Sequence, residues 1–201
     1  MTDTSNVTNT HNGHEFVDLG LPSGLLWATC NVGANSPEQA GLYFAWGETT
    51  GYTAEQVKSG ERAFDMASYK ASSISADLTL GKDAAHVNLG GNWRMPTKAE
   101  YQELLDNCDV TWTSSYMGKG VAGRLYTSRV NGNSLFFPAA GYCYNSSVGI
   151  VGSNGSYWSA SLFDTDEYSF TRAWYLYFLS GGQGVDNSYR YYGRSVRGVC
   201  E

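Results

Sequence analysis

Tyrosine side chains near the C-terminus carry the clearest contact chemistry in this sequence. Nine of the 15 tyrosines fall at or after Tyr142, in a stretch rich in serine, glycine and asparagine. Tyrosine offers a large contact area with few rotors to freeze, and small polar residues adapt their hydrogen bonds to a partner. Lysine, which is depleted in interfaces, does not occur after Lys119. This composition favours a binding surface in residues 142–197.

The spacing within residues 173–179 indicates how that surface is displayed. Successive side chains of a strand take opposite faces, so this segment separates into a core set and an outer set. The core set is Trp174, Leu176 and Phe178, and the outer set is Tyr175, Tyr177 and Leu179. A turn over 180–184 then leads to a second tyrosine-rich run. Strands that bury both faces are the alternative interpretation.

We predict that the tyrosines of this surface act as anchors for a ligand. Asp186, Asn187 and Ser188 are predicted as polar adapters, and Arg194 as a charged contact at the rim. The complete predicted contact set is Tyr144, Asn145, Ser156, Tyr175, Tyr177, Leu179, Asp186, Asn187, Ser188, Tyr189, Tyr191, Tyr192 and Arg194.

The four cysteines are the residues to consider for covalent chemistry. Cys30, Cys108, Cys143 and Cys200 are too widely spaced for a CxxC pair or a zinc motif. They allow three disulfide pairings, and small buried thiols are the interpretation we favour. No base flanks Cys143 or Cys200 to lower the pKa of its thiol. We therefore predict no catalytic residue.

An acidic loop is the one weak metal candidate. Asp164, Asp166 and Glu167 cluster in sequence, and calcium needs clustered oxygen ligands. A solvated acidic loop is the interpretation we favour, so no cofactor is predicted and calcium remains the alternative.

Composition bounds the class of protein. A chain of 201 residues with 42% hydrophobic and 16% charged residues is typical of a globular domain. A net charge of −6 argues against nucleic acid as a partner. No apolar run is long enough to span a membrane. The polar N-terminus lacks a signal pattern, so a signal was removed or none was used.

Local signals predict the elements that position the surface. Thr97–Glu100 forms a capping box, and apolar residues at helical spacing follow, which predicts a helix over 97–107. A second, short helix is expected near Pro37, where Ser36 and Gln39 have capping-box spacing. Runs with core patterning near both termini should pair as strands. Residues 1–14 should form a flexible polar leader.

Residues 91–101, GNWRMPTKAEY, resemble the W-R-[LM]-P-T-x-x-E-[FWY] signature of a C-type-lectin-like branch. That branch includes formylglycine-generating enzymes and the Fibrobacter-type major paralogous domains of gut bacteria. The resemblance implies an α+β, C-type lectin-like fold with a twisted antiparallel sheet, one or two helices and long loops, as a single domain over 15–201. Further stretches that resemble the paralogous-domain group lie at 16–24, 27–33, 43–49, 137–142, 152–155, 157–159 and 195–197.

The C-terminal segment is similar to the variable region of diversity-generating retroelement variable proteins. The pattern is A-[YW]-x-L-x-F-x-S-G-x-V-x-V-x-x-x-x-R-x-x-G-x-S-V-R, and Gln183 departs from its usual valine. The resemblance implies a non-enzymatic receptor or adhesin that binds a protein ligand, on a bacterial cell surface or a phage virion. A carbohydrate-binding surface and a formylglycine-generating-type enzyme are the alternatives. Matching scaffold residues are Ala173, Trp174, Leu176, Phe178, Ser180, Gly181, Val185, Arg190, Gly193, Ser195, Val196 and Arg197.

Overall fold

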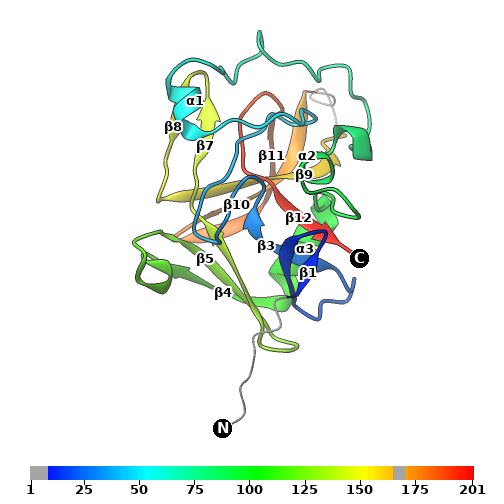
Figure 1. Cartoon of the computed structure of the whole chain (residues 1–201), viewed down its shortest axis with the longest axis vertical. Helices are drawn as coiled ribbons and strands as arrows, with labels where there is room; N and C mark the ends of the chain where they lie inside the picture. Colours follow the sequence, from blue (N-terminus) through cyan, green and yellow to red (C-terminus); the bar gives the residue numbers. More distant parts are fainter. Residues whose placement is uncertain (1–8, 165–170) are drawn as a thin grey trace.

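The computed structural model describes residues 9–164 and 171–201, in which short strands alternate with turns and irregular loops (Figure 1). All strand pairs named here are antiparallel. The elements are β1 (Thr10–His11), β2 (His14–Asp18), β3 (Leu26–Asn31), α1 (Ala54–Lys58), η1 (Leu80–Lys82), α2 (Ala84–Leu89), α3 (Lys98–Asn107), β4 (Cys108–Thr113), η2 (Tyr116–Gly118), β5 (Gly123–Ser128), β6 (Ser134–Pro138), β7 (Tyr142–Tyr144), β8 (Ser147–Gly149), β9 (Asn154–Leu162), β10 (Arg172–Leu179), β11 (Gly182–Tyr189) and β12 (Arg197–Cys200).

The fold is β-rich, with 40% strand and 14% helix. Across the described residues the strands form four small sheets, in the orders β1-β2-β3-β12, β11-β10-β9, β4-β5-β6 and β7-β8. The predicted α+β, C-type lectin-like fold on one twisted sheet is therefore wrong. Turns end the strands early, so their apolar faces are divided among several sheets, and α1 and α2 have only five and six residues.

The segment around Pro37 is a turn and not the predicted helix. The Asn35 N–H donates to the Gln39 side chain at 2.8 Å, and the Gln39 N–H donates to the Ser36 carbonyl at 3.1 Å. The Gln39 side chain thus accepts the N–H of Asn35 and not that of Ser36, so the reciprocal capping box does not form. Gly41 follows at a φ of 71°, a left-handed conformation through which a helix could not continue.

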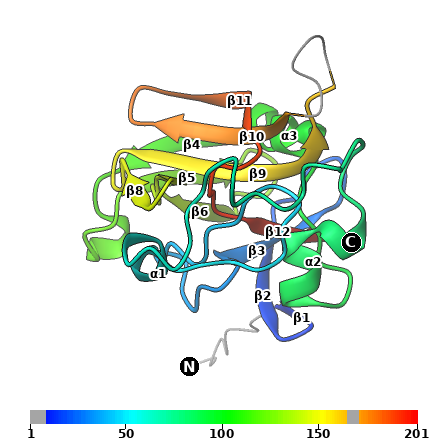
Figure 2. The same cartoon turned by 90° about the horizontal axis from the view of Figure 1, so that it is seen from above.

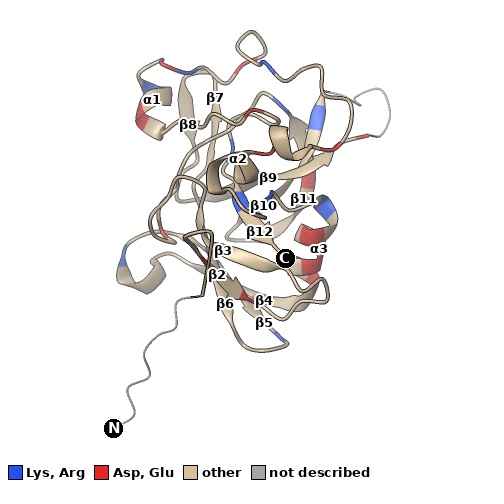
Figure 3. Cartoon of the chain, turned by 45° about the vertical axis from the view of Figure 1, so that its right-hand side comes forward, with Lys and Arg blue, Asp and Glu red and all other residues tan. Residues whose placement is uncertain are grey.

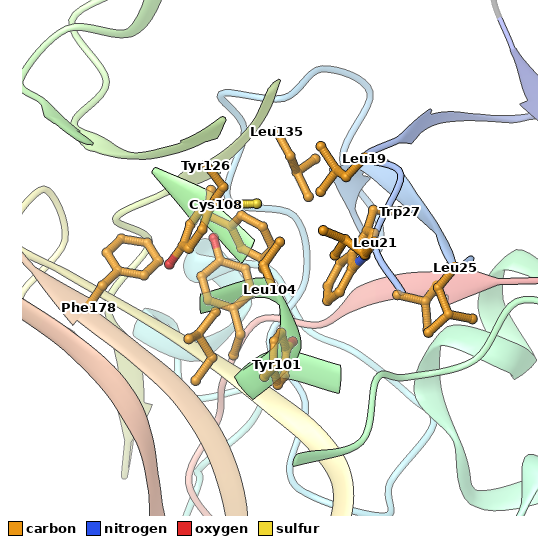
Figure 4. Packing of buried hydrophobic residues seen from close by; sticks show 14 of the residues in the cluster. Leu19, Leu21, Leu25, Trp27, Tyr101, Leu104, Cys108, Tyr126, Leu135 and Phe178 are labelled. Carbon is orange, nitrogen blue, oxygen red and sulfur yellow. The ribbon is translucent and has the colours of Figure 1, made fainter. Parts of the chain in front are cut away.

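Helix α3 is confirmed, with Thr97 as its N-cap and both hydrogen bonds of the capping box present. Its Tyr101 and Leu104 side chains are fully buried. Figure 4 shows them between Trp27 on one side and Phe178 on the other. Acidic residues lie along the helix (Figure 3). Because α3 packs between strands from both ends of the chain, it connects the N-terminal sheet to the β11-β10-β9 sheet.

The predicted pairing of strands from both termini is confirmed, because β3 lies between β2 and β12. Arg197 of β12 is fully buried. Its guanidinium donates to the Asn31 side chain at 2.7 and 2.9 Å and to the carbonyls of Ala28 and Thr29 at 2.9 and 2.7 Å. These bonds to β3 make Arg197 a scaffold residue, because all of its partners belong to the fold.

Trp174 of β10 is less buried than the predicted alternation implies. Leu176 and Phe178 are buried as expected, but Trp174 is only half-buried. The register of β10 against β11 is unbroken, so Trp174 stays on the face of Leu176 and Phe178. The pairing of β10 with β9 shifts beside it, from Ala173–Leu162 to Tyr175–Trp158. The Lys98 ammonium covers the Trp174 ring at 3.4 Å from its centroid. A β-bulge of this kind is set by strand pairing, so side-chain alternation alone does not reveal it.

Part of the predicted leader belongs to the fold, because β1 pairs with β2. The Asn12 side chain donates to the Leu89 carbonyl at 2.6 Å, and Trp93 Nε1 donates to the His11 carbonyl at 3.0 Å. Polar contacts and the packing of His11 and His14 against the Trp93 ring hold residues 10–14 in place. Residues 1–8 lie outside the described range.

Candidate ligand-binding site

Seven tyrosines from three chain segments come together beside the β11-β10-β9 sheet. Neighbouring rings have centroids 5.0–6.5 Å apart, in stacked, tilted and edge-to-face arrangements. Such aromatic pairs each contribute about 0.5–1.5 kcal/mol beyond area burial. The set is termed the tyrosine cluster and comprises Tyr142 and Tyr144 of β7, Tyr175 and Tyr177 of β10, Tyr189 of β11, and Tyr191 and Tyr192 of the following turn.

Tyr192 lies at the centre of the cluster. Its ring is 5.0 Å from Tyr191, 5.1 Å from Tyr144 and 5.8 Å from Tyr142. Tyr189 stacks on Tyr191 at 5.4 Å and extends the cluster toward β11. Burial among the rings raises the pKa of both Tyr191 and Tyr192. These hydroxyls are therefore neutral donors at physiological pH.

Arg194 lies beneath the cluster and not at its rim. Its side chain is 4% exposed, which corrects the prediction of a charged rim contact. The guanidinium carbon is 3.8 Å from the Tyr175 ring centroid, 5.4 Å from Tyr142 and 5.7 Å from Tyr192. Trp158 lies on it as well, at 4.8 Å. Cation–π contacts with four rings therefore join the β10 tyrosines to the others.

The Arg194 charge is poorly compensated. Burial lowers the pKa of its guanidinium to about 10. Nη1 donates to the Ser156 hydroxyl, but Nε has no hydrogen-bond partner in the described residues. No carboxylate forms an ion pair with it in that part of the chain.

Ser156 is fully buried, so it is not the surface contact that was predicted. It lies opposite Tyr177 in the register of β9 and β10 and accepts the bond from Arg194. Its role is to support the cluster from below. Strand β9 is covered by the C-terminal segment, where Ser195 N–H donates to the Ser156 carbonyl at 3.2 Å.

The three predicted polar adapters do not share one face. Strand β11 continues through Tyr189, so alternation applies to all of them. Asp186 lies opposite Tyr175 on the tyrosine face and is exposed, and Ser188 shares that face opposite Ala173. Asn187 lies opposite Trp174 on the other face, where the Arg172 guanidinium donates to its side chain at 3.1 Å.

The outer members of the predicted set reach solvent. Tyr144 is 45% exposed and Leu179 is 42% exposed, whereas Tyr175 and Tyr177 are half-buried. Asn145 is exposed in a left-handed conformation at the β7–β8 turn, and its backbone pairs with Phe64. Tyr144 is therefore the exposed member of the cluster, and its other six tyrosines are half-buried.

Two contributors were missing from the prediction, Tyr142 and Trp158. Tyr142 shares a strand face with Tyr144 because the two are separated by one residue, and that spacing was available in the sequence. Trp158 is fully buried beneath Tyr175 and packs edge-on at 6.0 Å. No local pattern distinguishes it from an ordinary core tryptophan.

The remaining candidates show no catalytic or metal-binding arrangement in the described residues. All four cysteines are free, and burial raises the pKa of the Cys108 thiol to about 11 and that of Cys143 to about 12. Such thiols are protonated and poor nucleophiles. Asp164 is exposed, while Asp166 and Glu167 lie outside the described range. No group of three potential metal ligands occurs among the residues described.

Two hollows in the surface lie apart from the tyrosine cluster. One, of about 550 Å³, is lined by parts of β2, β3, the 33–37 turn and α2. The other, of about 190 Å³, is lined by residues 47–50 and by Tyr52, Lys70, Ala71 and Lys82. No cluster tyrosine lines either hollow. The cluster is thus displayed on the surface outside both hollows.

A family model described as "Domain of unknown function (DUF8237)" matches residues 112–199. The matched stretch is similar to that family and contains every member of the tyrosine cluster. Comparison with curated proteins and with solved structures finds no match. None of the helices that the structure describes is long and apolar enough to cross a membrane.

Proposed function

We propose that this chain is a non-enzymatic binding domain that recognises a protein ligand through the tyrosine cluster. The observation that carries the proposal is the gathering of seven tyrosines on a strand scaffold, in a group of five contacting rings and a pair on β10 that a buried cation joins. Tyrosine is enriched at interfaces because its ring gives contact area and its hydroxyl gives a hydrogen bond. Rings already held by Arg194 lose little further freedom when a ligand binds.

Two further features support a protein ligand over a small molecule. The cluster lies outside both hollows, whereas small-molecule sites are concave. The sequence resemblance of residues 173–197 to retroelement-diversified proteins favours the same conclusion and an extracellular location on a bacterial or phage surface. The protonated thiols of Cys108 and Cys143 support the absence of thiol catalysis.

A glycan ligand is the second candidate, because the stacked Tyr189 and Tyr191 rings offer apolar faces on which a sugar ring can pack. The two candidates are separated by screening the domain against a glycan array and against a displayed library of bacterial surface proteins. Every selected binder is then retested with the triple variant Tyr144→Ala, Tyr189→Ala, Tyr191→Ala.

The matched control is Tyr116→Ala, because Tyr116 stacks on Phe136 at 3.9 Å outside the cluster. The proposal expects protein binders that lose affinity in the triple variant and keep it in the control. Binders found only on the glycan array would replace it with the glycan function. Binders unaffected by the triple variant would overturn the cluster as the site.

A test of diversification is independent of ligand identity. Residues 142–197 are sequenced in many individual copies of the gene from one source population. Substitutions concentrated at positions such as Tyr175, Tyr177 and Tyr191 would identify a diversified receptor. An invariant segment would indicate one fixed ligand and would remove the retroelement part of the proposal.

A further inference from the structure

The 190 Å³ hollow is distinguished by its charge. Lys70 and Lys82 line it, and they are two of only five lysines in a chain of net charge −6. Both are exposed, and neither forms an ion pair in the described residues. Because the protein as a whole is acidic, its overall composition does not explain why two unpaired lysines line the same hollow.

The one acidic residue in the lining does not neutralise these lysines. Glu48 accepts a 2.8 Å bond from the Arg62 guanidinium, and the two form a largely buried ion pair. Its second oxygen accepts the backbone N–H of Lys70 at 2.8 Å, which orients that residue through its main chain. The Glu48 charge is therefore matched by Arg62, and the ammonium groups of the two lysines are left uncompensated.

Asp83, which follows Lys82, also turns away from the hollow. Its carboxylate accepts the N–H groups of His86 at 2.9 Å and Met95 at 2.8 Å, and the residue is 2% exposed. It caps α2 from inside the fold. The lining of the hollow thus includes two lysines and the hydroxyl-bearing residues Thr49 and Thr50, and its one carboxylate, that of Glu48, is paired with Arg62.

We propose that this hollow is a binding site for a tetrahedral oxyanion, that is, a phosphate or sulfate group carried by a ligand. Lysine ammonium groups bind such groups as point charges, and hydroxyls add short hydrogen bonds. A volume of about 190 Å³ accommodates the oxyanion together with part of the molecule that bears it. The site shares no lining residue with the tyrosine cluster.

The wall of the hollow is coupled to the segment that carries the cluster. The Ala71 carbonyl accepts a bond from Arg190, which is fully buried between Tyr189 and Tyr191 in sequence. The Arg190 guanidinium also donates to the Ile74 carbonyl and to the Tyr69 hydroxyl, each at 2.8 Å. An anion that orders residues 69–74 would therefore act on a region that already supports the C-terminal turn.

The test uses the isotope-labelled 201-residue chain at low ionic strength and follows the amide signals of Thr49, Thr50 and Ala71. Inorganic phosphate and glucose 6-phosphate are titrated separately, with glucose as the uncharged control. The proposal expects saturable shifts with a phosphate compound, none with glucose, and weakening as salt is added. Saturation by inorganic phosphate indicates a free-ion site, and saturation by glucose 6-phosphate alone indicates a phosphate ester.

The double variant Lys70→Met, Lys82→Met should weaken binding by at least roughly tenfold, as expected for loss of charged hydrogen bonds. The matched control, Lys58→Met with Lys98→Met, removes the same charge outside the hollow and should bind as the wild type does. Lys70→Arg with Lys82→Arg should retain binding. Equal weakening in both methionine variants, or no saturation by either phosphate compound, would overturn the site.

Discussion

The guanidinium carbon of Arg194 lies 3.8 Å from the centroid of the Tyr175 ring, so the tyrosine cluster rests on a buried cation. Aromatic faces attract a cation, but they do not replace the water it loses on burial. The lowered pKa of this guanidinium has that loss of water as its main cause. Arg194 therefore orders the rings around it, while the burial of its charge lowers the stability of the fold.

Arg194→Met should leave the free energy of unfolding within about 1 kcal/mol of the wild type, because an apolar side chain of similar volume removes the uncompensated charge. Arg194→Ala should cost about 2–4 kcal/mol because it leaves a cavity among the rings. Urea unfolding monitored by fluorescence measures both. Arg197→Met serves as the contrast. This substitution leaves carbonyl and amide acceptors of β3 without their donor, so it should be strongly destabilising. Equal losses in the two Arg194 variants would show that the charge itself is stabilising.

The unequal burial of two β10 residues predicts unequal costs of truncation. Phe178 is fully buried and its ring lies against Gly155, where an added Cβ would be only 1.9 Å from the ring. Phe178→Ala should therefore cost about 3–5 kcal/mol. Trp174 is half-buried under Lys98, so Trp174→Ala should lower the free energy of unfolding clearly less. Thermal and urea unfolding of both variants decide the matter, and similar losses would mean that Trp174 belongs to the core.

Buried tyrosine hydroxyls predict a loss of stability at alkaline pH. Burial raises the pKa of Tyr101 and Tyr126, and that of Tyr157 to about 12. Their folded pKa values exceed the unfolded value of about 10. The stability that they contribute is thus complete below that pH and is lost as the pH rises through the folded values. Urea unfolding repeated across this range measures the decline.

Tyr126→Phe tests the source of that decline. The Tyr126 hydroxyl has no hydrogen-bond partner in the described residues, so its removal should stabilise the protein by on the order of 1 kcal/mol at neutral pH. The same variant should lose stability less steeply above pH 10, because one titrating group is gone. A destabilised variant with an unchanged alkaline slope would show that the hydroxyl is satisfied.

Asp186 protects the outer edge of the β11-β10-β9 sheet. Figure 2 shows β11 outermost, and no strand among the described residues pairs with its free side. The Arg190 N–H bonds to Thr171 at 3.2 Å, so by alternation the Asn187 N–H points away from β10. The Asp186 carboxylate accepts that N–H at 2.7 Å. A covered donor and a negative charge both disfavour pairing with another strand.

Asp186→Ala should therefore increase self-association relative to the wild type, because it uncovers an edge N–H and removes a repelling charge. Sedimentation at increasing protein concentration measures this effect. Asp164→Ala, an exposed position outside β11, removes the same charge and should have no such effect. Identical behaviour of the two variants would attribute any association to net charge.

The helix at 97–107 was predictable because its causes are local. The Thr97 and Glu100 capping bonds and the helical spacing of Tyr101 and Leu104 involve neighbours in sequence. The pairing of terminal strands followed from apolar patterning at both ends. The β10 tyrosines were also assigned correctly to the face opposite Leu176 and Phe178, because strand alternation depends only on spacing.

By itself, the sequence determined helix α3, the patterning of the terminal and β10 strands, and the chemical character of the C-terminal surface. Only the tertiary structure decided the β-rich class, the register shift between β9 and β10 beside Trp174, and the burial of Ser156 and Arg194. The reason is physical: bulges, sheet boundaries and the burial of a cation depend on contacts between segments far apart in the chain. Arg194 and Ser156 are 38 residues apart, and their pairing becomes visible only when β9 lies against the C-terminal segment.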